Sequence, residues 1–349
     1  MIYLILILLF ILSLVITYGY IHLAVRKKWL DVPNQRSSHT RIVPRGGGLV
    51  FISLWLLAAV IASFFQLWTV RQFLAVIPSA IIIAVTAFYD DRHSLSAKYR
   101  SCAYVAAACI SVGALGGFDH LIIAKNLSIP LGWLGSIIAI LIIAWSINLF
   151  NFMDGIDSIA GVEALFILGV GGFFLQQSGG QSMAFLSWML AATIAGFLVL
   201  NKSPAKVFMG DVGSASLGFI ILVIALLADK YYGIPLLLWL ILYGVFLFDA
   251  TITLVRRILA KEVWYHAHRL HAYQRLHQLG WSHGQVVWAV IGVNSFLAVL
   301  AILGFYYQNL MIWLAIFALG VLVLLYKIVE NLNPMYRKPN YLPPLKKGD

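Results

Sequence analysis

The segment from Leu131 to Asp157 reads LGWLGSIIAILIIAWSINLFNFMDGID and joins a long apolar run to a polar end. A helix needs about 20 apolar residues to cross a bilayer, and residues 131–150 supply such a run. The polar end of the segment contains Asn148, Asn151, Asp154 and Asp157. This stretch therefore predicts a membrane-spanning helix that ends in amides and acids at one membrane face.

The remainder of the chain has a similar composition. Of 349 residues, 62% are hydrophobic and only 11% are charged, whereas an ordinary soluble domain has about 25% charged residues. A soluble globular protein is therefore excluded. We expect an all-α polytopic domain over residues 1–333 and a basic tail over residues 334–349. Eleven spans are predicted, at residues 2–25, 48–68, 72–89, 101–117, 131–150, 159–177, 183–200, 215–229, 234–255, 285–306 and 309–328.

Basic residues are distributed unevenly between the two sets of alternate loops. With eleven spans, 21 of the 24 lysine and arginine residues fall on one side, and only Arg71, Lys125 and Lys230 fall on the other. Short loops rich in lysine and arginine stay in the cytoplasm, so we predict an outside N-terminus and a cytoplasmic C-terminus. The net charge of +11 then attracts anionic lipid or an anionic small substrate. Nucleic acid is not expected as a partner, because the basic residues are dispersed over short loops.

Acidic residues are expected on the same cytoplasmic face. They are Asp90 and Asp91 after the third span, Asp154 and Asp157 after the fifth, and Asp211 before the eighth. The spans themselves contain little more than Glu163 and Asp249, which is a poor supply for an ion or substrate pathway through the membrane.

The Asp90-Asp91 pair ends a predicted helix, where the helix dipole disfavours negative charge and the two carboxylates repel each other. A cation must compensate. Mg²⁺ with oxygen ligands would do so, with a contribution from Lys98, and the alternative is a hydrated acidic loop end beside Arg92. Similarly, the residues Asn148, Asn151 and Asp154 share a helix face if the turn is helical, and they either cap helix ends or hold a polar ligand.

Two glycine-containing turns are candidates for phosphate binding. Residues 208–214, FMGDVGS, open the eighth span, where backbone N–H groups favour an anion, although a plain N-cap explains the same residues. Residues 45–48, RGGG, form either a flexible turn into the second span or a backbone cradle for a ligand.

Residues 264–275, WYHAHRLHAYQR, contain three histidines within six positions. On a helix, His268, His271 and Arg275 would form one stripe, suited to hydrogen-bond phosphate oxygens as a cationic edge. The alternative is an interfacial amphipathic helix with a basic face. Zinc is disfavoured, because the sequence contains no HExxH motif.

Five ordered motifs carry a family resemblance: residues 31–39 with 44–48, Asp90-Asp91 with Lys98, residues 148–157, residues 208–214 and the histidine-rich loop 266–271. The chain resembles the polyprenyl-phosphate N-acetylhexosamine-1-phosphate transferases, or glycosyltransferase family 4. Its histidine loop looks like that of the branch that initiates O-antigen and departs from the triple-histidine run of the peptidoglycan branch. Ser158 stands where many relatives have glycine. These departures leave the sugar open but not the reaction class.

The resemblance implies transfer of N-acetylhexosamine-1-phosphate from a UDP-amino sugar to undecaprenyl phosphate, with release of UMP, in the bacterial inner membrane. The catalytic residues expected are Asp90, Asp91, Asp154, Asp157, His268 and His271. The substrate-binding residues expected are Arg45, Lys98, Asn148, Asn151, Asp154, Phe208, Arg269 and Arg275, with Phe208 stacked on uracil. The resemblance implies Asp211 as a ligand of Mg²⁺, together with Asp90 and Asp91, and Mn²⁺ is an alternative ion. A homodimer is an open option.

Two other classes compete with a transferase. A transporter or lipid flippase predicts ionisable groups near the membrane midplane and polar features on both faces. A non-catalytic protein that docks an anionic lipid on its basic face predicts that Asp90→Asn and Asp211→Asn are harmless, because each removes negative charge.

Overall fold

The computed structural model describes residues 2–33, 41–93, 95–124, 127–263 and 268–336, and within them the chain is a bundle of long helices. The helices are α1 (Ile2–Arg26), α2 (Gly48–Phe64), α3 (Val70–His93), α4 (Ala97–Leu115), α5 (Gly132–Met153), α6 (Ile159–Gln177), α7 (Gln181–Asn201), α8 (Asp211–Tyr232), α9 (Leu236–Leu242), α10 (Gly244–Leu259), α11 (Ala272–Gln278), α12 (His283–Tyr306) and α13 (Met311–Leu332), with a 3-10 turn at Gln308–Leu310. Two small antiparallel hairpins pair β1 (Leu30–Asp31) with β2 (Val43–Pro44) and β3 (His120–Ala124) with β4 (Leu127–Pro130).

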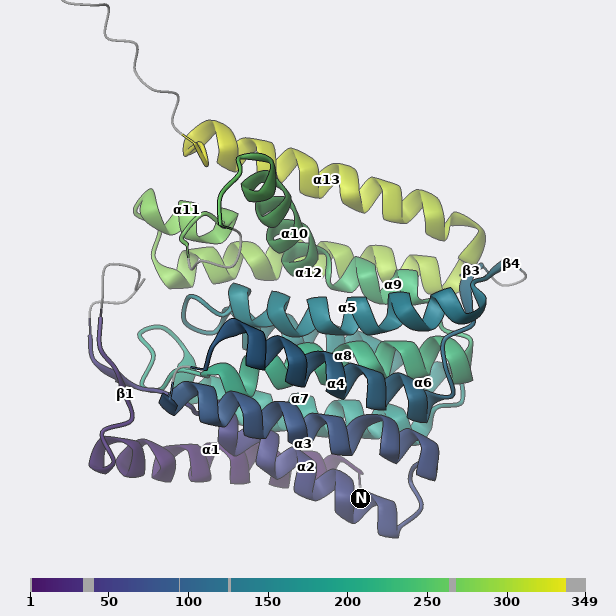
Figure 1. Cartoon of the computed structure of the whole chain (residues 1–349), viewed down its shortest axis with the longest axis horizontal. Coiled ribbons are helices and arrows are strands. Elements are labelled where there is room, and N and C mark those ends of the chain that lie inside the picture. Colours follow the sequence, from purple (N-terminus) through teal and green to yellow (C-terminus); the bar gives the residue numbers. More distant parts are fainter. Residues whose placement is uncertain (1, 34–40, 94, 125–126, 264–267, 337–349) are drawn as a thin grey trace, which may run out of the picture.

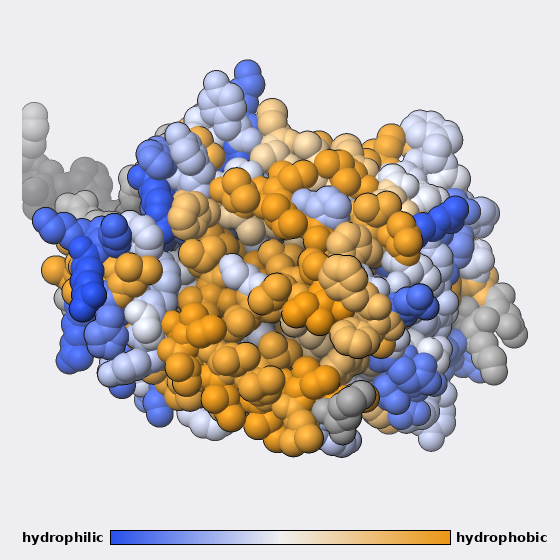
Figure 2. All heavy atoms as spheres, turned by 90° about the horizontal axis from the view of Figure 1, so that it is seen from below, coloured by the Kyte–Doolittle hydropathy of each residue, from blue (hydrophilic) through white to orange (hydrophobic). Residues whose placement is uncertain are grey.

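The long helices lie side by side along one axis, with β1 and α11 at one end and the β3–β4 hairpin at the other (Figure 1). Figure 2 shows a broad hydrophobic belt between two hydrophilic ends, as expected for a protein that crosses a bilayer. Helix α8 lies in the centre and packs against α3 and α5, and 94% of its membrane-length apolar stretch is buried. Helices α1 and α13 are only 17% and 22% buried, because most of their apolar surface faces the surroundings of the bundle.

The all-α membrane fold is confirmed, but the described residues do not contain eleven continuous helices of membrane-spanning length and composition. Eight described helices have the length and composition of a membrane span. The predicted span 234–255 is divided into α9 and α10, which are bent by 81° and together would make a ninth. Helix α2 has 17 residues, and α4 begins with the charged residues Lys98 and Arg100, so each falls short of a full apolar span.

Apolar length alone does not reveal the break in the ninth span. Gly244, the only glycine of residues 234–255, is the first residue of α10. A Cβ atom at Gly244 would lie 2.8 Å from a methyl carbon of Leu297, so glycine there allows α10 to pack closely against α12. The orientation across the membrane and the basic tail remain predictions, and residues 337–349 of the tail lie outside the described residues.

Candidate active site

Arg45 lies between two carboxylates that come from different helices. Its Nη2 atom is 2.9 Å from Asp91 Oδ1, at the end of α3, and 2.7 Å from Asp211 Oδ1, at the start of α8. The two acidic side chains are 6% and 17% exposed. Burial disfavours the charge on Arg45, but the attraction of Asp211 and Asp91 outweighs it and raises the pKa of the guanidinium. Segments far apart in the sequence thus form one charged cluster.

Asp91 also caps helix α8. The backbone N–H of Asp211 donates a hydrogen bond to Asp91 Oδ2 over 3.2 Å. A helix N-terminus favours a negative group because its first N–H groups have no partner within the helix. The place expected for a phosphate, residues 208–214, therefore already holds a carboxylate of the protein.

The glycine turn at residues 46–48 binds the backbone that leads into α8. Gly46 and Gly47 donate to the carbonyl of Phe208 over 3.1 and 2.9 Å, and Gly48 donates to that of Met209 over 2.8 Å. A Cβ atom at Gly48 would lie 2.4 Å from Gly213 Cα, so glycine lets α2 approach α8. These N–H groups have partners, and the structure therefore favours a close-packed turn over an open phosphate cradle.

Asp90 has partners of its own. Its Oδ2 atom is 2.7 Å from Arg100 Nη1, and its Oδ1 atom accepts a hydrogen bond of 2.7 Å from the N–H of Leu95. The adjacent acids consequently have different tasks, because Asp90 closes the turn from α3 to α4 while Asp91 faces α8. Lys98 is exposed in the first turn of α4.

Asp154 directly follows α5 and belongs to the same electrostatic cluster. Burial raises the pKa of Asp154 well above its usual value, and the charge of Asp211 raises it further, against the attraction of Arg45; Asp91 contributes a smaller increase. Carboxylates of α3, α8 and the α5–α6 turn therefore lie close enough to repel one another.

The amides before Asp154 differ in their contacts. Asn151 donates to Ser214 Oγ of α8 over 3.2 Å, whereas Asn148 donates to the carbonyl of Ala144 within its own helix over 2.8 Å. Asn151 thus joins α5 to the start of α8. Phe208, the residue expected to stack on uracil, is half-buried, and its N–H donates to the Pro44 carbonyl over 2.8 Å.

Asp157 joins three segments at the edge of the site. Its Oδ2 atom is 3.1 Å from His283 Nδ1, at the start of α12, and accepts a hydrogen bond of 3.2 Å from the N–H of Ala205. Burial acts to raise the pKa of Asp157, but the hydrogen bond and charge of His283, together with the Ala205 N–H, outweigh it and lower the pKa. The next residue, Ser158, has a φ of +68°, a conformation that glycine adopts without strain.

The histidine loop is not the helical stripe that the spacing predicted. Helix α11 begins only at Ala272, so His268 and His271 precede it, and His266 lies outside the described residues. Burial, with the charges of His271 and Arg257, lowers the pKa of His268 to about 4. Its Nδ1 atom accepts a hydrogen bond of 3.3 Å from Leu270, which leaves the proton of a neutral imidazole on Nε2. His268 is thus a neutral donor at physiological pH.

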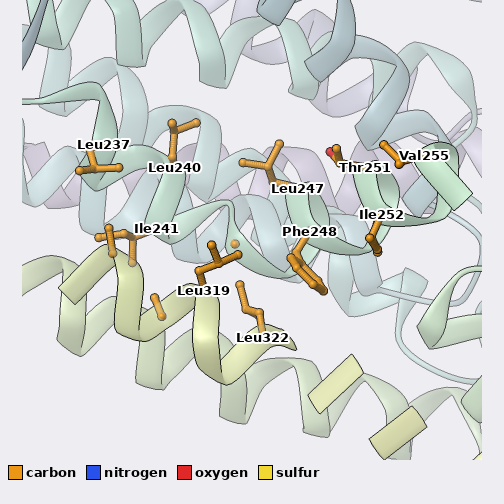
Figure 3. Close-up of a pocket in the computed structure, with 13 residues that line it drawn as sticks. Leu237, Leu240, Ile241, Leu247, Phe248, Thr251, Ile252, Val255, Leu319 and Leu322 are labelled. Atoms are coloured by element: carbon orange, nitrogen blue, oxygen red, sulfur yellow. The ribbon is translucent and has the colours of Figure 1, made fainter. Parts of the chain in front are cut away.

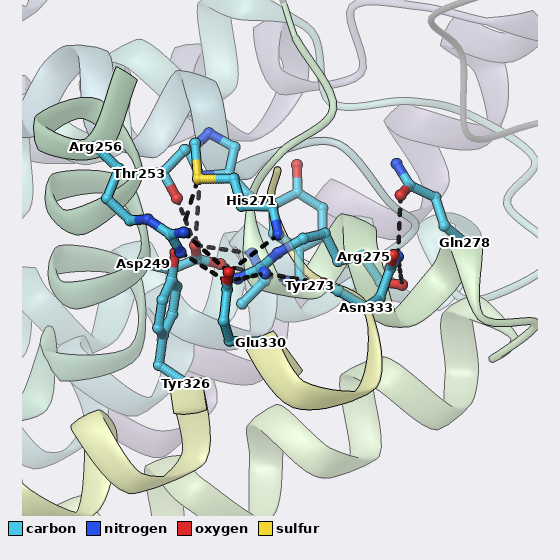
Figure 4. Close-up of polar contacts among 12 residues, drawn as sticks. Asp249, Thr253, Arg256, His271, Tyr273, Arg275, Gln278, Tyr326, Glu330 and Asn333 are labelled. Carbon is cyan, nitrogen blue, oxygen red and sulfur yellow. Dashed lines mark hydrogen bonds and ion pairs between the residues drawn. The ribbon is translucent and has the colours of Figure 1, made fainter. Parts of the chain in front are cut away.

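Two acids that sequence reasoning did not assign hold the helix after this loop (Figure 4). Asp249 of α10 accepts a hydrogen bond of 2.9 Å from the N–H of Ala272 and is 3.5 Å from His271 Nδ1. Glu330 of α13 pairs with Arg275, whose side chain is 1% exposed. For Asp249, an acid within the apolar run 234–255 was the available signal, because a buried charge requires a partner.

The structure therefore brings together Arg45, Asp91, Asp154, Asp211 and Asn151, while Arg275 lies in a separate pair with Glu330. Arg269 is half-buried, and its carbonyl accepts a hydrogen bond of 2.9 Å from Gln278. A cleft of about 390 Å³ opens beside Asp91 and Arg45, and its lining includes Tyr20, Lys28, Trp29 and Arg92.

The carboxylate cluster has the oxygen donors that Mg²⁺ prefers. Among the described residues, no group of three or more histidine, cysteine, aspartate or glutamate side chains forms a ready metal site. Mg²⁺ is usually held by one or two carboxylates together with substrate phosphates.

Residues 73–229 match the family model described as glycosyl transferase family 4. A relative from Bacillus subtilis (strain 168), a probable undecaprenyl-phosphate N-acetylglucosaminyl 1-phosphate transferase, is 31% identical over 327 residues, which cover 92% of this chain and 88% of the relative. An undecaprenyl-phosphate alpha-N-acetylglucosaminyl 1-phosphate transferase from Yersinia pestis is 28% identical over 86% of this chain and 83% of its own. A phospho-N-acetylmuramoyl-pentapeptide-transferase from Gloeothece citriformis (strain PCC 7424) is 31% identical over 74% of this chain and 73% of its own.

Proposed function

Because the chain belongs to glycosyl transferase family 4, the superfamily of polyprenyl-phosphate N-acetylhexosamine-1-phosphate transferases, we propose that it transfers N-acetylhexosamine-1-phosphate from a UDP-amino sugar to undecaprenyl phosphate. UMP is the second product. The reaction would start a lipid-linked glycan, such as O-antigen or another cell-surface polysaccharide. The observation that carries this proposal is the cluster of Asp91, Arg45, Asp211 and Asp154, whose acids lie at the ends of the membrane-length helices α3, α5 and α8.

In this reaction an oxygen of the acceptor phosphate attacks the sugar-bound phosphorus of the donor. One phosphoanhydride bond forms, the bond to UMP breaks, and UMP leaves with the electron pair of that bond. Catalysis consists mainly of positioning two anions and neutralising their charge. Arg45 is placed for this task, because it is a charged group between two carboxylates and borders the cleft.

The acids and the histidine loop have separate roles in the proposal. Mg²⁺, or Mn²⁺ in its place, would be held by Asp211 and Asp91 and would supply positive charge to the donor diphosphate. Asp90 supports Asp91 by closing the turn with Arg100. Neutral His268 would donate its Nε2–H to a phosphate oxygen, and Asn151 and Phe208 would line the nucleotide site.

The fold also suits a lipid acceptor. Helix α3 is long and apolar enough to cross a membrane, so a phosphate held at its end would lie at the membrane surface, with its hydrocarbon chain in the bilayer. The bend of the ninth span leaves an apolar groove of about 440 Å³ against α13 (Figure 3). Its lining is hydrophobic except for Gly244 and Thr251, and it offers the hydrocarbon chain a protein surface.

One assay tests class, metal and donor together. The purified protein is incubated with undecaprenyl phosphate, a panel of UDP-N-acetylhexosamines, and either Mg²⁺ or EDTA, and released UMP is measured. The proposal predicts UMP from at least one donor, only with acceptor and Mg²⁺ present. Absence of UMP from every donor, by protein that remains folded, would contradict it and favour a transporter or a lipid-binding protein.

A further inference from the structure

Two buried acids cap helices α9 and α11, and a third buried acid lies beside the first turn of α10, at the break in the ninth span. Asp229 of α8 accepts a hydrogen bond of 2.9 Å from the N–H of Leu236, the first residue of α9. Asp249 of α10 accepts one of 2.9 Å from Ala272, the first residue of α11. Glu163 of α6 interacts with the backbone N–H of Phe246, in the first turn of α10. Each acid comes from outside the helix whose first turn it faces.

Glu163 lies deepest, because its side chain is fully buried within the helix bundle. Its Oε2 atom accepts a hydrogen bond of 2.6 Å from Asn294 Nδ2 of α12. The carboxyl group therefore connects α6, α12 and the first turn of α10 at one point. Burial of such a group is costly unless it has partners, and an apolar residue would serve packing alone better.

The first turn of α10 needs a partner because the chain bends there. The first regular bond of this turn runs from Leu247 N–H to the Tyr243 carbonyl, over 2.8 Å. The N–H groups before it have no acceptor within their own helix. In the membrane interior no water compensates, so a side chain must do so, and Glu163 is the acid beside them.

The direction of α10 determines where His271 and the start of α11 lie. Asp249, on α10, holds the start of α11 and faces His271, as Figure 4 shows. Tyr273 of α11 in turn donates to the carbonyl of Phe152 over 3.2 Å, two residues before Asp154. A continuous set of contacts thus leads from Glu163 to the acidic cluster.

We propose that Glu163, oriented by Asn294, is a positioning residue that fixes the bend between α9 and α10 and so places His271 and α11 against the turn that carries Asp154. This inference rests on the proposed function only in its effect on turnover. Its structural part, the direction of α10, stands apart from the reaction.

The test measures that direction and the kinetics in the same variants. Spin labels at Leu259→Cys, the exposed end of α10, and Lys202→Cys, after α7, report a distance in a background with Cys102→Ser and Cys109→Ser. The variants are Glu163→Leu, Glu163→Gln and Asn294→Ala. Ser13→Ala is the control, because it removes a buried hydrogen bond between α1 and α7, away from the ninth span.

We expect Glu163→Leu to shift or broaden this distance and to lower kcat by about tenfold or more, because small displacements of catalytic groups are costly. The KM for the UDP-sugar should change by less than about threefold, since α3 and α8 are undisturbed. Glu163→Gln should keep the distance and kcat close to those of the unmodified protein. Asn294→Ala should have effects between those of Glu163→Gln and Glu163→Leu, and Ser13→Ala should change neither the distance nor kcat.

An unchanged distance in folded Glu163→Leu would overturn the proposal. If Glu163→Leu does not fold, an unchanged distance in Asn294→Ala has the same meaning. A shifted distance in a protein that releases no UMP from any donor would support the role of Glu163 in the bend and reject the proposed reaction, so the two failures are distinguishable.

Discussion

Asp90 and Asp91 are neighbours in the sequence, but they act on different segments. Asp91 binds Arg45 and the first turn of α8, whereas Asp90 binds Arg100 and the turn into α4. Both acids were expected as ligands of Mg²⁺, and the structure shows that they have different partners. Replacements at the two positions should have different consequences.

At the residue scale, the most sensitive positions are Asp91 and Asp211. We expect Asp211→Asn to lower turnover by about 100-fold or more, because it removes one charge that organises the site. UMP release by membrane-embedded, folded protein is the measurement. Asp119→Asn, an exposed acid beside the β3–β4 hairpin, is the matched control and should retain activity. Normal turnover in Asp211→Asn would remove this residue from the mechanism.

The raised pKa of Asp154 predicts a pH dependence. Below that pKa the side chain is neutral and adds no negative charge beside the proposed ligands Asp211 and Asp91, so Mg²⁺ affinity in the presence of donor should rise with pH and level off once Asp154 is ionised. The effect on the free energy of unfolding has the opposite sign. The pKa of Asp154 in the folded protein lies above 3.8, the ordinary value of an aspartate. The stabilisation by neutral Asp154 is therefore complete below pH 3.8 and is lost as pH rises through the folded pKa. Titration calorimetry of Mg²⁺ across pH measures the first effect. A pH profile that Asp154→Asn leaves unaltered would refute it.

At the element scale, α11 is held between α10 and α13. Arg275 is buried against Glu330 and donates to the carbonyl of Asn333 over 3.0 Å. This arrangement favours a structural task over the substrate contact expected from the sequence.

We therefore expect Arg275→Met to reduce the free energy of unfolding by about 3 kcal/mol, because it leaves Glu330 with one partner fewer. Thermal unfolding in detergent measures this change. Lys261→Met, an exposed basic residue nearby in the sequence, should leave stability unchanged. An unaltered melting temperature combined with a raised KM for the UDP-sugar would instead assign Arg275 to the substrate.

At the scale of the whole molecule, much of the arrangement could be predicted from the sequence, because membrane spans depend on apolar length and the acids follow from span ends. Each predicted span coincides with a helix or, for residues 234–255, with the pair α9 and α10. The 81° bend could not be predicted, since it depends on Glu163 and Asn294, which are 131 positions apart. The partners of the glycine turn and of Arg275 are likewise long-range contacts.

The charge count predicts the orientation of the whole bundle. Leu127, in the β3–β4 hairpin, and Lys202, after α7, are both exposed and suit cysteine substitution. In cells with a permeabilised outer membrane and an intact inner membrane, a membrane-impermeant maleimide should label Leu127→Cys. It should label Lys202→Cys only after the inner membrane is also permeabilised. The reverse pattern would place the acidic cluster outside the cell.

The proposed reaction requires that the acidic cluster binds both the metal ion and the donor diphosphate. The most direct measurement is anomalous diffraction from crystals of the protein with Mn²⁺ and a UDP-N-acetylhexosamine that it uses or binds. We predict one strong manganese peak, bound by carboxylate oxygens of Asp91 or Asp211 and by the donor diphosphate. A manganese peak away from both aspartates, with the diphosphate bound elsewhere, would contradict the account.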